Sequence, residues 1–277
     1  MRIKKKLSLI AIFAKSYHEI CDKQKAAMGI SNWNEILDNW WLGLGFFFDR
    51  AFYQGRRDEV SLQFEQATQQ ALHQFFGMTA NSRRKRLWQL YRSNFLGKDN
   101  FGRRLNPLAA TLKNKYEVDG KKRRTGKKGD NLMVADVLHF ICERTHLRSE
   151  PLNLVTYMKE GIRNGQIAEL ADELDSIYQV GEKIYSMLLR DVIDLFKLSK
   201  HLSPDDYKYV QAVDTWVEQL ANKLGFDGSK KQLAVRFAEA CREHNVDPIA
   251  FNQGAWYLAA HSFDILTDNI GRIKPLK

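Results

Sequence analysis

The chain has 277 residues and a mass of 32.2 kDa, a length that suits one large domain or two closely packed ones. Hydrophobic residues make up 44% and charged residues 27%, with only 17 glycines and 5 prolines, which excludes collagen-like, coiled-coil and wholly disordered proteins. Lys and Arg outnumber Asp and Glu by 43 to 33, and the net charge of +10 favours polyanions as partners.

The first predicted element is an N-terminal helix. Arg2 and Lys4 to Lys6 precede an apolar run from Leu7 to Ala14, a pattern that imitates a secretory signal. The run is short, Ser8 interrupts it, and no small-x-small cleavage pattern follows, so we interpret it as helix. No other stretch reaches transmembrane length. We therefore expect a cytoplasmic protein without a membrane partner.

Helical spacing of apolar residues dominates the rest of the chain. Residues 58–76 carry an apolar stripe on one face and glutamines and charges on the other. Similar patterns recur at 85–96, 132–147, 152–161, 166–177, 181–198, 205–224, 230–244 and 248–268. The apolar run around Phe46 to Phe48 is too dense for a surface and is expected in the core. The pattern predicts an all-α protein of about ten helices.

Residues 97–130 are the exception, rich in Gly, Asn, Lys and Arg. Six of the eight residues from Lys121 to Lys128 are basic, and their repulsion predicts an extended or mobile segment. Two interpretations stay open: a solvated surface loop, or a loop that binds DNA phosphates with an affinity that falls with salt. In the second, the phosphate-binding residues are Lys121, Lys122, Arg123, Arg124, Lys127 and Lys128.

The stretch from Glu169 to Phe196 predicts two helices joined by a hairpin, with Gly181 at the bend. Such a hairpin can present backbone N–H groups, at the positive end of the second helix, to a DNA phosphate. Further along, Asp214 stands directly before a helical pattern, where an aspartate is a good N-cap.

These two segments carry a resemblance to a known superfamily. VGEKIYSMLLRDV resembles the hairpin of the helix-hairpin-helix base-excision DNA glycosylases, and AVDTWV is similar to their VDTH-type segment, with Trp216 where histidine often stands. The 31-residue spacing from Lys183 to Asp214 is nearest to the archaeal 8-oxoguanine glycosylase-like branch. The chain departs from the pattern at Gln179, which replaces the first hairpin glycine, and at Glu182, which adds negative charge.

The resemblance implies a two-lobed all-α fold with the active site in the cleft between the lobes. One lobe is expected to combine residues 1–90 and 233–277, and the other to span 91–232 with the basic loop. The hairpin, through Gln179 and Gly181, would bind the DNA backbone. Asp214 would be the catalytic carboxylate, and Lys183 would form a Schiff base with C1′ of the sugar and permit β-elimination. An alternative within the superfamily stays open: in a monofunctional glycosylase, Asp214 would activate water and Lys183 would only contact a phosphate.

A glycosylase must extrude its target nucleotide into a pocket with aromatic or apolar walls. The segment VDPIAFNQGAWYLAAH resembles the terminal helix of the superfamily and mixes aromatic with amide side chains. The predicted base pocket consists of Trp256, Gln54, Asn252, Gln253 and Met187. For the aromatic residues, a purely structural role in the core stays open.

The resulting hypothesis is a DNA repair enzyme of the base-excision type, acting as a monomer on double-stranded DNA that contains a modified base. Alternatives are a non-catalytic helix-hairpin-helix DNA-binding protein, a helical interaction protein, or a glycosylase for hypermodified bases of viral DNA. HExxH, GxSxG, Walker A and GxGxxG motifs are absent. Cys21, Cys142 and Cys241 are expected to be buried, reduced thiols, and they cannot by themselves supply the four thiolates of an iron–sulfur cluster. Base excision of this type needs no metal or other cofactor, so none is expected.

Overall fold

The structure is a computed structural model that describes residues 3–52, 58–77, 79–93, 115–118, 121–124, 128–144 and 151–268. Helices dominate these residues, which confirms the all-α class in its coarse form. The chain divides into two compact units. Unit 1 contains Met1–Gly29 and Tyr185–Lys277, and unit 2 contains Ile30–Ile184. No described helix combines the length and apolar character that crossing a membrane requires.

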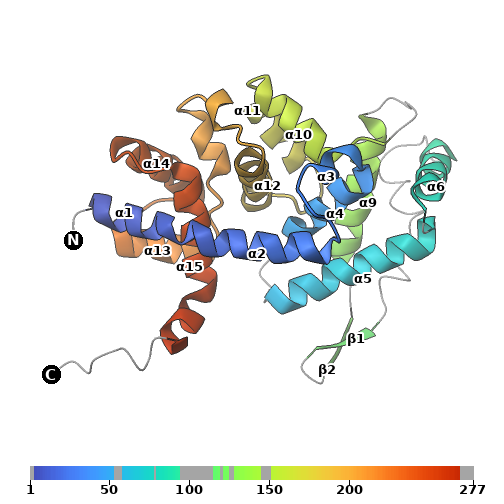
Figure 1. Ribbon diagram of the computed structural model, residues 1–277, viewed down its shortest axis with the longest axis horizontal. Coiled ribbons are helices and arrows are strands. Elements are labelled where there is room, and N and C mark those ends of the chain that lie inside the picture. The colour runs from blue at the N-terminus through green and yellow to red at the C-terminus, as the bar shows by residue number, and fades with distance from the viewer. Residues whose placement is uncertain are drawn as a thin grey trace. The chain divides into compact units, whose positions relative to one another are not determined.

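In unit 1, the N-terminal helices α1 (Ile3–Ile12) and α2 (Ala14–Ala27) pack along α15 (Pro248–Asp268), near the other end of the chain (Figure 1). The crossing is close because α15 carries Gly254. A Cβ atom at this position would lie 2.0 Å from the carbonyl oxygen of Ile10.

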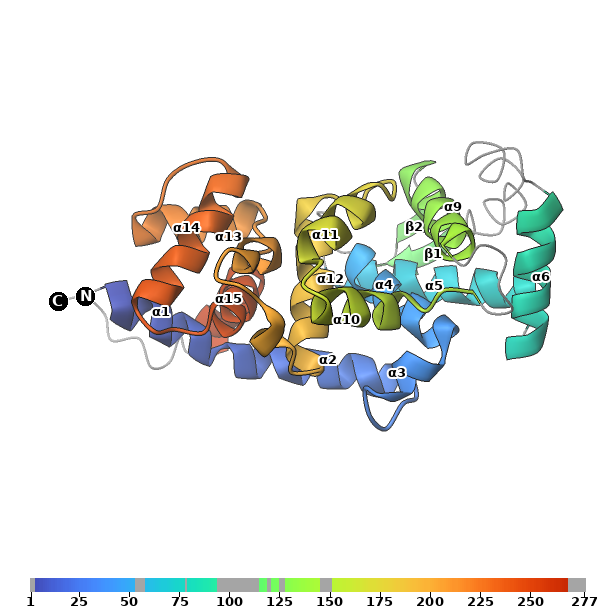
Figure 2. The same cartoon turned by 90° about the horizontal axis from the view of Figure 1, so that it is seen from above.

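The rest of unit 1 is formed by α12 (Glu182–Leu195), the 3-10 helices η1 (Ser199–His201) and η2 (Asp206–Val210), α13 (Thr215–Leu224) and α14 (Lys230–Glu243). The first three residues of α12 belong to unit 2. Both α13 and α14 lie beside α15 (Figure 2). Gly225, in the left-handed conformation, ends α13, and a capping box of Ser229 and Gln232 starts α14.

Unit 2 is built around α4 (Trp40–Ala51), which packs against α3 (Glu35–Asp38), α5 (Asp58–Phe76) and α10 (Leu154–Arg163). Phe46, Phe47 and Phe48 are fully buried, as predicted. Asn153 caps α10 and also donates to the carbonyl oxygens of Ile36 and Leu37 at 2.6 and 2.9 Å. One side chain thus ties the start of α10 to α3.

The remaining helices of unit 2 are α6 (Ala80–Ser93), α9 (Lys128–Glu143) and α11 (Ile167–Asp175). The unit also contains an antiparallel pair of short strands, β1 (Lys115–Val118) and β2 (Lys121–Arg124), with Lys115 opposite Arg124. The extended conformation expected for residues 121–124 is confirmed. The pairing itself was not predicted, although the intervening Asp119-Gly120 is a strong hairpin signal.

Two predicted segments are divided differently in the structure. The helix predicted over 205–224 is in fact η2 and α13, because residues 211–214 between them are not helical and Asp214 caps a new helix. The predicted lobes, 1–90 with 233–277 and 91–232, also differ from the two units. The reason is packing: α3 and α4 pack against α10, whereas α13 packs against α14 and α15.

Candidate functional site

The hairpin between α11 and α12 forms a tight bend. Gln179, at the position of the first hairpin glycine, has a φ of 63°, in the left-handed region that glycine adopts without strain. The N–H of Val180 donates to the carbonyl oxygen of Ile177 at 2.9 Å, and both of these side chains are buried. The two apolar anchors therefore impose a glycine-like conformation on Gln179.

In contrast to Ile177 and Val180, the hairpin residues Tyr178, Gln179 and Gly181 are exposed. The backbone N–H of Tyr178 donates to Oδ2 of Asp136 on α9 at 2.9 Å. This bond ties the hairpin to α9, and it also places a carboxylate beside the hairpin. Together with Glu182, Asp136 makes the surroundings of the predicted phosphate site more negative than the sequence motif alone suggests.

Lys183 lies in the first turn of α12 and is partly exposed. It belongs to unit 2, whereas Asp214 belongs to unit 1. The prediction that these two side chains act on one sugar therefore stays a prediction.

Asp214 is the N-cap of α13, as predicted. Its Oδ1 accepts hydrogen bonds from the backbone N–H groups of Trp216 and Val217 at 3.0 and 2.9 Å. The carboxylate is partly exposed, while the preceding Val213 is buried. The cap orients the carboxylate at the positive end of the helix, where negative charge is favoured.

The segment that leads to Asp214 is held by α15. Asn252 accepts from the N–H of Ala212 and donates to its carbonyl oxygen, both at 3.2 Å. Gln211 donates to the carbonyl oxygen of Pro248 at 3.2 Å. Because Ala212 precedes Asp214 by two residues, Asn252 fixes the backbone from which the candidate catalytic carboxylate projects.

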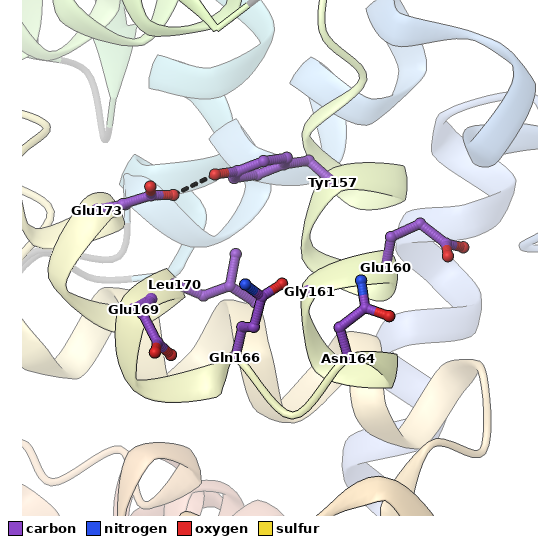
Figure 3. Close-up of a pocket in the computed structure, with 8 residues that line it drawn as sticks. All are labelled: Tyr157, Glu160, Gly161, Asn164, Gln166, Glu169, Leu170 and Glu173. Atoms are coloured by element: carbon purple, nitrogen blue, oxygen red, sulfur yellow. Dashed lines mark hydrogen bonds between the residues drawn. The ribbon is translucent and has the colours of Figure 1, made fainter.

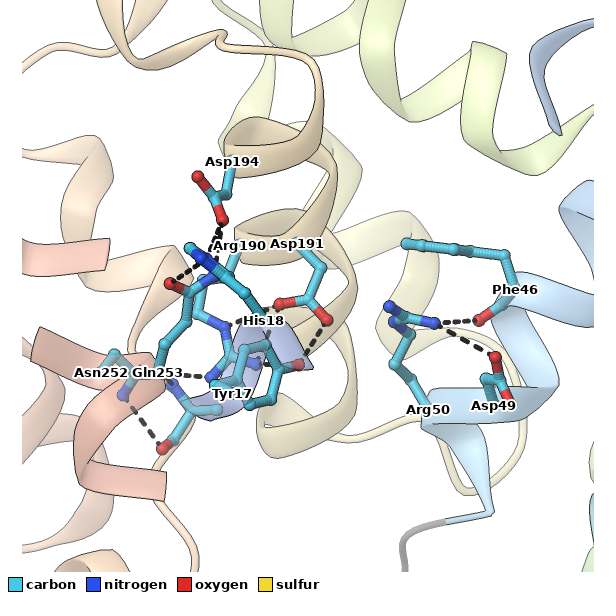
Figure 4. A network of polar contacts seen from close by, with 11 residues as sticks. Tyr17, His18, Phe46, Asp49, Arg50, Arg190, Asp191, Asp194, Asn252 and Gln253 are labelled. Atoms are coloured by element: carbon cyan, nitrogen blue, oxygen red, sulfur yellow. Dashed lines mark hydrogen bonds and ion pairs between the residues drawn. The ribbon is translucent and has the colours of Figure 1, made fainter. Parts of the chain in front are cut away.

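Asn252 is in turn part of a buried network around Arg190 (Figure 4). The fully buried guanidinium donates from Nη1 to Asn252 at 2.7 Å, from Nε to Asp191 at 2.9 Å and from Nη2 to the Tyr17 hydroxyl at 2.6 Å. The Tyr17 hydroxyl donates to the second oxygen of Asp191 at 2.6 Å.

Burial alone would lower the pKa of Arg190, but the charge of Asp191 and its hydrogen bond to the guanidinium help to outweigh burial, and the pKa is raised. The guanidinium therefore stays protonated, and Asp191 balances its charge inside the unit.

A second polar cluster lies nearer the surface of unit 1. Gln253 and His18 both bind Oδ2 of Asp194, at 2.9 and 2.7 Å. The hydrogen bond to Asp194 raises the pKa of His18. Burial alone would raise the pKa of Asp194, but the hydrogen bonds from His18 and Gln253 lower it. The amide of Gln253 thus donates its hydrogen bond to a carboxylate of the protein itself.

The predicted base pocket needs correction. Trp256, Asn252, Gln253 and Met187 are all buried inside unit 1. The ring of Trp256 packs edge-on against that of Tyr17, with centroids 5.6 Å apart. Since the amides of Asn252 and Gln253 already bind protein groups, we reassign these residues from base recognition to support of the fold. Gln54 and Lys127 lie outside the described residues.

Unit 2 contains an open cavity of about 180 Å³ between α10 and α11 (Figure 3). Three of its lining residues are carboxylates: Glu160, Glu169 and Glu173. The Tyr157 hydroxyl donates to Glu173, which also pairs with Arg144 at 2.7 Å. The acidic lining would repel a DNA phosphate, so this cavity is unsuited to the DNA backbone.

Unit 2 also contains two buried carboxylic acids, Asp49 and Glu65. Arg50 on α4 donates to the carbonyl oxygen of Phe46 at 3.3 Å and pairs with Asp49 at 3.5 Å (Figure 4). Burial raises the pKa of Asp49 to about 6 despite Arg50. Burial and, next, the charge of Asp49 raise the pKa of Glu65 on α5 to about 8. Sequence patterning did not single out Glu65, because it occupies an ordinary position in a helical segment.

Cys21, Cys142 and Cys241 are all buried, as predicted, and none of the three forms a disulfide. Within the part of the chain that the structure describes, no three or more His, Cys, Asp or Glu side chains are grouped so that they could hold a metal ion. Comparison of the chain with models of known families, with curated proteins and with solved structures gave no match.

Proposed function

We propose that this protein is a DNA glycosylase that flips out and excises a modified base, with an associated lyase activity at the resulting abasic site. Its partner is double-stranded DNA that carries such a base, and it works as a monomer without a cofactor. The proposal builds on the resemblance of the hairpin and Asp214 segments to the helix-hairpin-helix glycosylases.

The observation that carries the proposal is the bend at Gln179. A non-glycine residue rarely adopts a φ of 63°, so the surrounding packing must hold it there. The replacement of the first hairpin glycine therefore leaves the glycine-type conformation intact. This supports a hairpin that contacts the DNA backbone through its exposed residues.

Asp214 has the chemistry that base excision requires. Breaking the N-glycosidic bond develops positive charge on the sugar, and a fixed carboxylate stabilises that charge without having to reorganise. Two backbone N–H groups and the clamped segment at Ala212 hold Asp214 in place. In the proposed reaction, its carboxylate faces the sugar as the base leaves.

Lys183 supplies the amine for the lyase step. Its neutral Nζ attacks C1′, the bond from C1′ to the base breaks, and the base departs with the electron pair of that bond. The C1′–O4′ bond of the sugar then opens: the nitrogen lone pair forms the C=N bond of an imine, and O4′ takes up a proton. Removal of a C2′ proton then expels the 3′ phosphate. Lysine at the first turn of α12 lies next to the hairpin that is proposed to hold the DNA backbone.

The basic segment provides a further phosphate contact in this proposal. Lys121 to Arg124 form β2, and Lys128 begins α9. Their combined charge favours a polyanion and makes binding depend on salt. The carboxylates of Asp136 and Glu182 oppose it near the hairpin, so we expect modest rather than tight backbone binding.

Borohydride trapping on duplex DNA with one abasic site tests the proposed amine. We expect a covalent adduct with the wild-type chain and none with Lys183→Ala. Lys200→Ala, which removes an exposed lysine from η1, is the matched control and should trap normally.

A panel of duplexes, each with a single modified base, tests excision itself. Release of a base by the wild-type chain, lost in Asp214→Asn, supports the proposal. No release from any oxidised, alkylated, deaminated or hypermodified base, together with salt-dependent duplex binding, would instead identify a non-catalytic DNA-binding protein. No duplex binding at all would favour a helical interaction protein.

A further inference from the structure

Trp216 is unusual among the tryptophans of this chain. Its side chain is 58% exposed, whereas Trp40, Trp41, Trp88 and Trp256 are each 8% exposed or less. An exposed indole leaves a large apolar surface in water, which burial against a partner would remove. Single exposed apolar residues are common on protein surfaces, so exposure alone assigns no role.

The position of Trp216 adds the second argument. It is the second residue of α13, and its backbone N–H donates to Asp214 at 3.0 Å. The N-cap therefore fixes the start of the helix that carries the indole. Since Asn252 clamps the segment before it, the exposed ring stands on a rigid support next to the candidate catalytic carboxylate.

Two further exposed residues share its face of α13. Gln219 and Lys223 follow Trp216 by three and seven positions, the spacing that aligns side chains along one side of a helix. We call these three residues the Trp216 stripe. It combines a flat aromatic ring, an amide that can both donate and accept hydrogen bonds, and an ammonium group.

We infer that the Trp216 stripe is a nucleic-acid-binding surface on which one unpaired nucleobase stacks against the indole. Gln219 contacts the edge of that base, and Lys223 contacts the neighbouring phosphate. The inference rests on the proposed function for its choice of DNA as the partner, but it needs no catalysis.

The chemistry of the stripe favours a nucleotide over an apolar protein groove. Every base has a π-face that can stack on an aromatic ring, and each such contact is worth about 1–3 kcal/mol. The lysine and the net charge of +10 complement a phosphate backbone. In a regular duplex all bases are paired and stacked, so the stripe discriminates in favour of unpaired or everted bases.

Binding of the full-length chain to a fluorescently labelled oligothymidylate, measured by anisotropy, tests the inference. Stacking of 1–3 kcal/mol corresponds to an affinity loss of about 5- to 150-fold in Trp216→Ala. Trp216→Phe, which keeps an aromatic ring, should recover most of the affinity. Lys223→Gln should lower the slope of log affinity against log salt by about 0.7.

Val235→Ala on α14 is the matched control, because Val235 is also exposed, at 38%, and lies outside the stripe. It should bind like the wild type. Circular dichroism of each variant checks the fold, which exposed substitutions should leave intact. Affinity equal to wild type in Trp216→Ala would overturn the inference, as would equal losses in Trp216→Ala and Trp216→Phe.

The binding assay separates this inference from the proposed function. If Trp216→Ala weakens oligonucleotide binding while no modified base is ever excised, the stripe stands and the glycosylase proposal fails. If excision occurs but Trp216→Ala binds and excises normally, the glycosylase proposal stands and the stripe is refuted.

Discussion

Replacing Asn252 with leucine tests the buried network that supports the Asp214 segment. The substitution keeps a similar volume but removes three hydrogen bonds: one from Arg190 at 2.7 Å and two with the backbone of Ala212 at 3.2 Å. All of these groups are buried and so have no access to water as a replacement partner. The network makes Asn252 a support of the fold, so its loss should destabilise unit 1.

The size of this destabilisation follows from the hydrogen-bonding groups that Asn252→Leu leaves without a partner. A buried backbone N–H or C=O without a partner costs about 1–3 kcal/mol, and the bond to a charged guanidinium is worth about 1.5–3 kcal/mol. The apolar leucine side chain offsets part of this sum. We expect a net loss of about 3–5 kcal/mol in the free energy of unfolding, a large share of the 5–15 kcal/mol that is typical of folded proteins.

Urea denaturation followed by circular dichroism measures this loss. With a slope of about 3 kcal/mol per molar, the midpoint of Asn252→Leu should fall by about 1–1.7 M. Asn222→Leu, at an exposed position of α13, is the control and should change the free energy by no more than about 0.5 kcal/mol. A loss below about 1 kcal/mol in Asn252→Leu would refute the role of the network.

Two further predictions concern buried groups elsewhere. The pKa of Glu65 is about 8 in the folded state, against 4.5 for an ordinary glutamate, so its ionisation opposes folding. The free energy of unfolding should therefore fall as pH rises from about 4.5 to 8 and level off above pH 8. In a plot of Tm against pH, Glu65→Gln should flatten this part of the curve. Parallel curves for the two proteins would contradict the raised pKa of Glu65. Gly254→Ala should lower Tm more than Gly161→Ala, because its new Cβ meets the backbone oxygen of Ile10 at 2.0 Å whereas the other meets only a leucine side chain. The opposite order in a thermal melt would show that the α1 and α15 crossing can relax.

Periodic apolar residues determined most helices in advance. The helix predicted over 58–76 matches α5, and the apolar faces predicted for α11 and α12 are largely buried. The local chemistry of Asp214 likewise predicted an N-cap, because a cap depends on residues within one turn of the chain. The sequence analysis did not predict the hairpin of β1 and β2, because it interpreted residues 121–128 by their charge alone and not by the Asp119-Gly120 turn signal before them.

The roles of the polar side chains, in contrast, depend on contacts between distant parts of the chain. Asn252 and Gln253 look like base readers in sequence, yet Arg190, Ala212 and Asp194 occupy their amides in the structure. These partners lie 40 to 62 residues away, and no local pattern identifies them. The raised pKa of Glu65 has no local sequence signal for the same reason, since desolvation depends on what packs around a side chain.

The amino-acid sequence by itself thus determined the helical class, the position of the bend and the cap at Asp214, all of which depend on short-range spacing. Only the tertiary structure decided which polar residues are structural and which are exposed to a partner. That decision depends on burial and on hydrogen bonds between segments, which leave Trp256 buried and Trp216 exposed.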